Sequence, residues 1–132
     1  MSARRSLEAV VSVVETYFDG LHHSDTTRLR QVFHPLAQYV TVSDGTLLHR
    51  DMQTYFEVVD KRPSPASRGE ARSDEIVAIE FAGPATARVN LRCSIGSRDF
   101  VDFLTLIDID GRWQIISKVF HFTEKGSSHA LR

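Results

Sequence analysis

The sequence has a single cysteine, Cys93, so one chain cannot form an internal disulfide. This excludes an oxidised, disulfide-stabilised scaffold and a zinc site built from a cysteine cluster, and we expect a reducing, cytoplasmic location. Neither sign of charge dominates, since 16 basic side chains oppose 17 acidic ones. No basic run is long enough to follow a phosphate backbone, so we expect no nucleic-acid partner.

Long hydrophobic runs are also lacking. No window reaches the roughly 20 apolar residues that a membrane span needs. Two arginines near the N-terminus are followed by acidic residues in an amphipathic pattern, not by the apolar region of a secretory signal, so no membrane partner is expected. The length of 132 residues fits one domain, residues 1–132, with flexible ends expected at about 1–6 and 125–132.

What the sequence does contain is a clear order of elements, beginning with helices. Apolar residues from Leu7 to Leu21 recur at three- and four-residue spacing, which predicts a long amphipathic helix. A shorter helix is predicted from Asp25 to Phe33, because Asp25 offers an N-cap oxygen. Asp51 can cap a third helix. The buried side of that helix is predicted to hold Met52, Tyr55, Phe56 and Val59.

Strands are predicted around and after the third helix. The turn at Asp44 and Gly45 separates two short runs of strand-forming residues, 37–42 and 46–49, which indicates a small hairpin. The remainder of the chain predicts four longer strands joined by short turns, and therefore an antiparallel meander. Those strands are predicted at residues 76–81, 85–95, 99–109 and 112–123.

This α+β order resembles the nuclear transport factor 2-like (NTF2-like) cone, also called SnoaL-like or ketosteroid-isomerase-like. In that fold, three N-terminal helices pack in a curved antiparallel sheet of mixed strand lengths. The resemblance rests on the segment from Tyr17 to Asp25, on Phe33 to Pro35, and on the ending from Asp102 to His121. The ending is most similar to the branch called "putative lumazine-binding". The fold hosts isomerases, cyclases, dehydratases and non-catalytic modules, so it implies an architecture more firmly than a function.

Asp102 is the most unusual residue of the predicted sheet, because strand alternation places it on the same face as Phe100. An apolar setting disfavours the charged form of an acid, so Asp102 is predicted to be protonated and to donate a hydrogen bond to a ligand. The resemblance to steroid isomerases places Tyr17 and Asp102 on the tyrosine and the neutral aspartate of their oxyanion hole. The alternative for Asp102 is an ion pair across the sheet with Arg92 or Lys118.

The proton-accepting base of those isomerases falls at Thr41 in this sequence, and threonine cannot remove that proton. A true steroid isomerase is therefore disfavoured. Histidine transfers protons near neutral pH, and His121 is the catalytic candidate because alternation predicts it on the apolar face of its strand with Trp113. His34 and His49 are candidate replacements for the missing base.

Two functions stay open. The first is an enclosed apolar pocket for a small apolar or aromatic molecule, with cofactor-free, metal-free isomerase, lyase or cyclase chemistry at Tyr17 and Asp102. The second is a non-catalytic ligand-binding or protein-interaction module that forms a homodimer through the outer sheet face, where Lys118 is predicted with Arg88 and Arg92. A cavity that reaches Tyr17 and Asp102 favours the first, and a filled interior favours the second. The predicted ligand-binding residues are Phe33, Tyr39, Thr41, His49, Tyr55, Phe56 and Trp113.

Overall fold

The computed structural model describes residues 2–126, so most of the C-terminal tail that was expected to be flexible lies outside the described residues. Three α-helices form where the sequence predicts them. They are α1 (Ala3–His23), α2 (Thr26–Val32) and α3 (Met52–Lys61), and a 3-10 helix, η1 (Ala66–Arg68), follows in the loop after α3. None of the helices within residues 2–126 combines the length and apolar character needed to cross a membrane.

Six strands form one sheet in the order β2-β1-β6-β5-β4-β3. The last four make the predicted antiparallel meander, and β1 and β2 make the predicted hairpin. One pairing departs from an all-antiparallel sheet: β1 runs parallel to β6, which makes the sheet mixed. The strands are β1 (Phe33–Thr41), β2 (Leu48–Arg50), β3 (Asp74–Phe81), β4 (Thr86–Ile95), β5 (Arg98–Ile109) and β6 (Arg112–Glu124).

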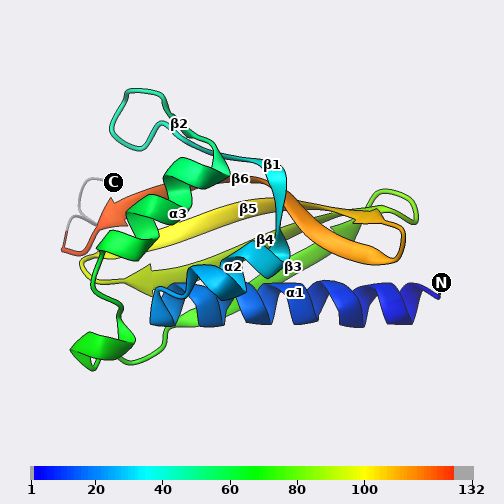
Figure 1. Ribbon diagram of the computed structural model, residues 1–132, viewed down its shortest axis with the longest axis horizontal. Coiled ribbons are helices and arrows are strands. Elements are labelled where there is room, and N and C mark those ends of the chain that lie inside the picture. The colour runs from blue at the N-terminus through cyan, green and yellow to red at the C-terminus, as the bar shows by residue number, and fades with distance from the viewer. Residues whose placement is uncertain (1, 127–132) are drawn as a thin grey trace.

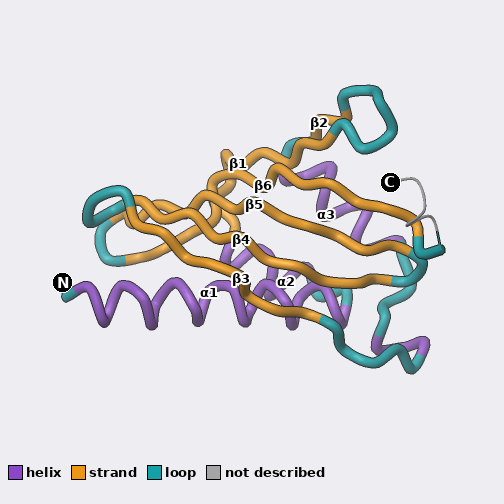
Figure 2. The backbone as a smooth tube through the Cα atoms, turned by 180° about the vertical axis from the view of Figure 1, so that it is seen from behind, coloured by secondary structure: helices purple, strands orange, loops and turns teal. Residues whose placement is uncertain are grey.

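All three α-helices lie against one face of the curved sheet, and the opposite face carries no helix (Figures 1 and 2). Asp25 and Asp51 cap α2 and α3 as predicted, each accepting a backbone N–H from the residue three positions later. α1 and α2 approach closely at Gly20, where an added Cβ would lie 2.6 Å from Cδ2 of Leu29. A larger residue at that crossing would therefore force the buried Leu29 side chain to shift.

An irregularity between β5 and β6 decides which side chains enter the interior. Thr105 pairs with Ser117. The next residue of β5, Leu106, pairs with Ile115, so Ile116 is an extra residue in β6. This β-bulge reverses the alternation of β6, because side chains on the two sides of an extra residue change faces.

The bulge corrects two predictions for β6. Trp113 points inward before it, as predicted, but beyond it the inward positions are Lys118 and Phe120. The prediction that Lys118 lies on the outer face with Arg88 is therefore wrong: Lys118 is only 4% exposed. The prediction that His121 shares the buried face of Trp113 is wrong for the same reason, and His121 is exposed.

Candidate functional site

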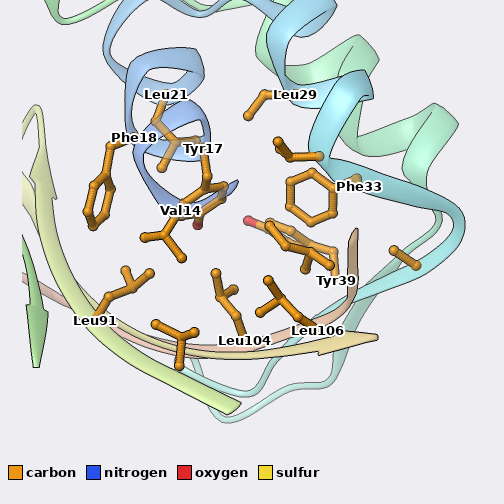
Figure 3. Packing of buried hydrophobic residues seen from close by; sticks show 14 of the residues in the cluster. Val14, Tyr17, Phe18, Leu21, Leu29, Phe33, Tyr39, Leu91, Leu104 and Leu106 are labelled. Carbon is orange, nitrogen blue, oxygen red and sulfur yellow. The ribbon is translucent and has the colours of Figure 1, made fainter. Parts of the chain in front are cut away.

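Tyr17 and Asp102 meet in the centre of the cone, as the resemblance implied. Tyr17 comes from α1 and Asp102 from β5, and the Tyr17 hydroxyl donates a hydrogen bond of 2.5 Å to Oδ2 of Asp102. Both side chains are fully buried. Figure 3 shows Tyr17 pointing from α1 into the interior, where Phe33 and Tyr39 converge on the same space. Burial, reinforced by the negative charge of Asp102, raises the pKa of Tyr17 well above its ordinary value.

Lys118 is the third member of this polar centre. Its Nζ lies 4.0 Å from Oδ2 of Asp102, the same oxygen that accepts the Tyr17 hydroxyl. Within residues 2–126, Asp102 is the only acid within ion-pair distance of Lys118. Five aromatic rings surround the ammonium, with centroids 4.9–5.9 Å from Nζ. They belong to Tyr17, Tyr39, Tyr55, Phe100 and Phe120.

Two opposing influences set the charge of Lys118. Burial is the largest and disfavours the ammonium, whereas Tyr55 and Asp102 beside it favour the ammonium. The favourable influences prevail, so the pKa of Lys118 is raised and the side chain is a cation at neutral pH. This geometry matches the ion-pair alternative for Asp102, with Lys118 rather than Arg92 as the partner, and Arg92 is exposed.

Other polar groups near Lys118 are held in their neutral forms. Desolvation raises the pKa of the Tyr55 hydroxyl and raises the pKa of the Cys93 thiol to about 12. Cys93 is therefore an unreactive buried thiol at neutral pH. Two buried oxygens of the centre, Oδ1 of Asp102 and the Tyr55 hydroxyl, make no hydrogen bond with any residue in the described part of the chain.

The predicted ligand-binding residues divide among several places. Tyr39 and Tyr55 belong to the ring set around Lys118. Phe33 and Phe56 instead line a separate cavity of about 540 Å³ between α2, β1 and α3. Trp113 lies apart from both: its ring packs 5.8 Å from that of Phe81, and it lines a surface hollow beside α1 and α2.

Thr41 and the histidines are held by local contacts. The Thr41 hydroxyl donates to the backbone oxygen of Phe120 at 2.6 Å. His49 is exposed and hydrogen-bonds Gln38, while Nδ1 of His34 accepts a backbone N–H two residues later. His121 lines a groove of about 750 Å³ at the ends of β3, β4, β5 and β6. The structure thus brings none of these four residues to the Tyr17–Asp102 pair.

Within residues 2–126, side chains fill the space around Tyr17 and Asp102. Neither Tyr17 nor Asp102 lines the cavities described above, and the hydroxyl of one is bound to the carboxyl of the other. The space beside them is occupied by the Lys118 side chain and its rings. Within residues 2–126, no three His, Cys, Asp or Glu side chains gather as they do around a metal ion.

Sequence reasoning missed Lys118 as a site residue. The signal was present, because a lysine stands between Ile116 and Phe120 in a strand of apolar residues. Simple alternation assigned it to the outer face, and the extra residue of the bulge cannot be read from the hydrophobic pattern.

Three helices on the inner face of a curved mixed sheet (Figure 1) are the features of an NTF2-like cone. Solved structures agree. An NTF2-like protein of unknown function from Shewanella baltica OS155 matches with a TM-score of 0.85 at 25% identity, covering 95% of this chain and 99% of that one. A second, from Silicibacter pomeroyi DSS-3, matches with a TM-score of 0.79 at 22% identity, covering 93% and 100%.

The chain belongs to the family described as "putative lumazine-binding", which matches residues 5–121. It is also similar to the aldolase FrzH of Cladobotryum sp., with 28% identity over 116 residues that make up 86% of this chain and 89% of the aldolase. Both the predicted α+β cone and the predicted branch are thereby confirmed.

Proposed function

We propose that this protein binds a small aromatic carbonyl compound inside the cone and carries out cofactor-independent proton transfer on it, as a lyase or isomerase. The observation that carries the proposal is the buried Tyr17–Asp102–Lys118 centre. A buried ionic cluster of this kind contributes little to the stability of the fold, because apolar residues of similar volume often stabilise an interior as well or better. Its presence in an otherwise apolar core favours a chemical role.

One relative favours the lyase class. The similarity to an aldolase directs attention to reactions in which a carbon–carbon bond forms or breaks next to a carbonyl group. Such a reaction passes through an enolate, which needs a base for a C–H proton and a partner for the resulting oxyanion. The aromatic interior suits a flat ligand, in keeping with the family's description.

The hydrogen bond between Tyr17 and Asp102 favours different catalytic roles for the two residues, and not the predicted role of two oxyanion donors. Tyr17 donates its only hydroxyl proton to Asp102, and Lys118 places a positive charge beside the same carboxyl. Both contacts suit a carboxylate, which accepts a proton. We therefore assign Asp102 as the base and Tyr17 as the residue that orients it. Asp102 thus takes the role of the base, which Thr41 cannot perform.

A ligand must enter by displacing a cover, because the centre is buried. The segment 62–73 closes one end of the cone, where Pro65 and Ser73 line a hollow of only about 20 Å³ with Phe18 and Cys93. Two ion pairs of Arg72 hold the end of this segment against the rest of the domain, and the side chains in both pairs are partly exposed to water. Arg72 pairs with Asp19 of α1 at 2.7 Å and with Asp74 of β3 at 3.1 Å.

Deuterium exchange tests this function without knowledge of the natural substrate. In D₂O, the wild-type protein is expected to accelerate exchange of the α-protons of 2-tetralone, an aromatic ketone, as followed by NMR. Asp102→Asn is expected to reduce this acceleration by about 10²-fold or more, because an amide cannot act as the base. Asp99→Asn, an exposed change on the same strand, serves as the matched control.

Two outcomes would contradict the proposed function. Wild-type exchange no faster than in buffer would remove the catalytic role. Retained exchange in Asp102→Asn would restore Asp102 to an oxyanion donor, because an amide still donates a hydrogen bond.

The filled interior favours a second candidate, a non-catalytic module that acts as a homodimer through the outer sheet face. Phe103 and Val119 pair on adjacent strands of that face and are 53% and 47% exposed. We propose this apolar strip as the contact with a second copy. Phe103→Asp is then expected to convert a wild-type dimer to a monomer by light scattering, whereas Leu36→Asp, outside the strip, leaves the mass unchanged. A wild-type monomer, or a Phe103→Asp dimer, would contradict the interface.

A further inference from the structure

The position of Lys118 carries an inference that rests on the proposed function and makes it more specific. The parallel pairing of β1 with β6 sets Lys118 beside Tyr39, and the β5 pairing sets it beside Leu104, two residues from Asp102. The ammonium therefore lies against side chains from β1, β5 and β6 as well as from α1 and α3. It occupies the middle of the cone and not its rim.

Lys118 is placed poorly for an ion pair whose only role is structural. A charge-assisted hydrogen bond has a donor–acceptor distance of about 2.7–2.9 Å, whereas Nζ is 4.0 Å from Oδ2 of Asp102. Tyr17, at 2.5 Å, already takes the nearer position on that oxygen. The aromatic rings attract the cation but accept no conventional hydrogen bond from it. The ammonium thus keeps donor capacity that a bound oxygen would use.

Two residues beside Lys118 each carry a buried oxygen without a hydrogen-bond partner in the described part of the chain. The Tyr55 ring is 5.4 Å from Nζ, and its buried hydroxyl makes no hydrogen bond within residues 2–126. Oδ1 of Asp102 is likewise buried and without a partner there. Leaving buried polar groups unpaired costs about 1–3 kcal/mol each. A donor, a cation and an acceptor that remain available together are what an enolising carbonyl compound requires.

We infer that Lys118 is a catalytic residue, a fixed cation that binds the carbonyl oxygen of an enolisable aromatic ketone or β-dicarbonyl compound, with the Tyr55 hydroxyl as second donor. In the step, a C–H bond next to the carbonyl breaks and its proton passes to Oδ1 of Asp102. The electron pair moves into the carbonyl group and leaves an enolate oxygen against Lys118. The proton returns from Asp102 to the product, so atoms and charge balance and no oxidant or reductant is consumed.

The charged form of Lys118 distinguishes this role from that of a nucleophile. Covalent imine chemistry needs the free amine, and the raised pKa of Lys118 keeps the side chain protonated at neutral pH. The titratable groups that face it are Tyr17, Tyr39, Tyr55, Cys93 and Asp102. None of these groups carries a positive charge that would oppose the ammonium, and Asp102 favours it, so the positive charge of Lys118 remains across the neutral range.

The test uses benzoylacetone, an aromatic β-diketone whose enolate absorbs at longer wavelength than its neutral form. Binding beside a fixed cation is expected to lower the pH at which the bound diketone ionises by about one to two units. Absorbance titrations are compared for wild type, Lys118→Met and the exposed control Lys61→Met. The shift is expected in wild type and Lys61→Met and to be lost in Lys118→Met. Tyr55→Phe, which keeps the ring, is expected to lose part of it.

The outcomes separate this inference from the proposed function. An equal shift in wild type and Lys118→Met overturns the role of Lys118 while leaving small-molecule binding intact. A borohydride-stable mass increase on Lys118 overturns the fixed-cation role, because it reveals an amine nucleophile. No binding to wild type overturns both proposals. If Lys118→Met does not fold, the comparison of wild type with Tyr55→Phe decides, since an unchanged shift there removes the second donor and overturns the arrangement.

Discussion

Asp102→Ala is expected to lower the free energy of unfolding by about 3–5 kcal/mol, because it leaves a buried ammonium without its counter-charge. Asp102 is the only acid that the described residues place within ion-pair distance of Lys118, and the lysine is only 4% exposed. The variant also removes the acceptor of the Tyr17 hydroxyl. Urea unfolding at neutral pH measures the effect.

The control for this variant is Asp99→Ala, an exposed acid three residues earlier in the same strand. It is expected to leave the stability nearly unchanged, since exposed polar contacts contribute little. A loss of less than about 1 kcal/mol in Asp102→Ala, similar to that of an ordinary surface change, would show that Lys118 does not depend on this carboxyl.

Stability is expected to fall steeply above about pH 9. Four buried groups, Tyr17, Tyr55, Cys93 and Lys118, have pKa values above those of the unfolded chain. As pH rises past the ordinary values of 9.0 for the thiol, 10.0 for tyrosine and 10.5 for lysine, the unfolded chain releases protons that the folded chain retains. Each such group then lowers the free energy of unfolding by about 1.4 kcal/mol per pH unit.

Urea unfolding between pH 7 and pH 11 measures this dependence. Stability is expected to be nearly constant up to about pH 8, below the ordinary thiol value, and then to decline with increasing slope. Cys93→Ala is expected to delay the onset of the decline, because it removes the group with the lowest ordinary value. A stability that stays constant to pH 11 would contradict the burial of protonated groups in the cone.

Most of the fold was accessible from the sequence, because its signals are local. The aspartates that cap α2 and α3, and the apolar spacing of α1, located the helices. Short turns between the last four strands fixed the antiparallel meander. The parallel pairing of β1 with β6 was not predicted, because four strands and α3 lie between the two in the chain, and no local pattern records such a contact.

The candidate site was only partly accessible. Tyr17 and Asp102 were identified by resemblance, and they do meet. Both were predicted to donate hydrogen bonds to a ligand, whereas in the structure Tyr17 donates to Asp102. One extra residue in β6, Ile116, turns Lys118 inward and His121 outward, the reverse of the predicted faces. A bulge adds one residue to a strand and leaves its apolar composition unchanged, so the hydrophobic pattern does not reveal it. It nevertheless decides whether a lysine or a histidine enters the cone.

The filled interior has the same origin. Tyr17, Tyr39 and Tyr55 were predicted to face a pocket, but they close around the Lys118 ammonium instead, together with two rings that were not predicted there, Phe100 and Phe120. A long side chain from the bulged strand takes the space that a ligand would occupy.

A double-mutant cycle between Asp102 and Lys118 tests the central claim, a buried charge pair at the heart of the cone, most directly. The free energy of unfolding is measured for wild type, Asp102→Ala, Lys118→Met and the double variant. The account predicts that Lys118→Met rescues most of the loss caused by Asp102→Ala, with a coupling energy of about 2–3 kcal/mol. Strictly additive losses would show that the two charges do not interact and would contradict the account.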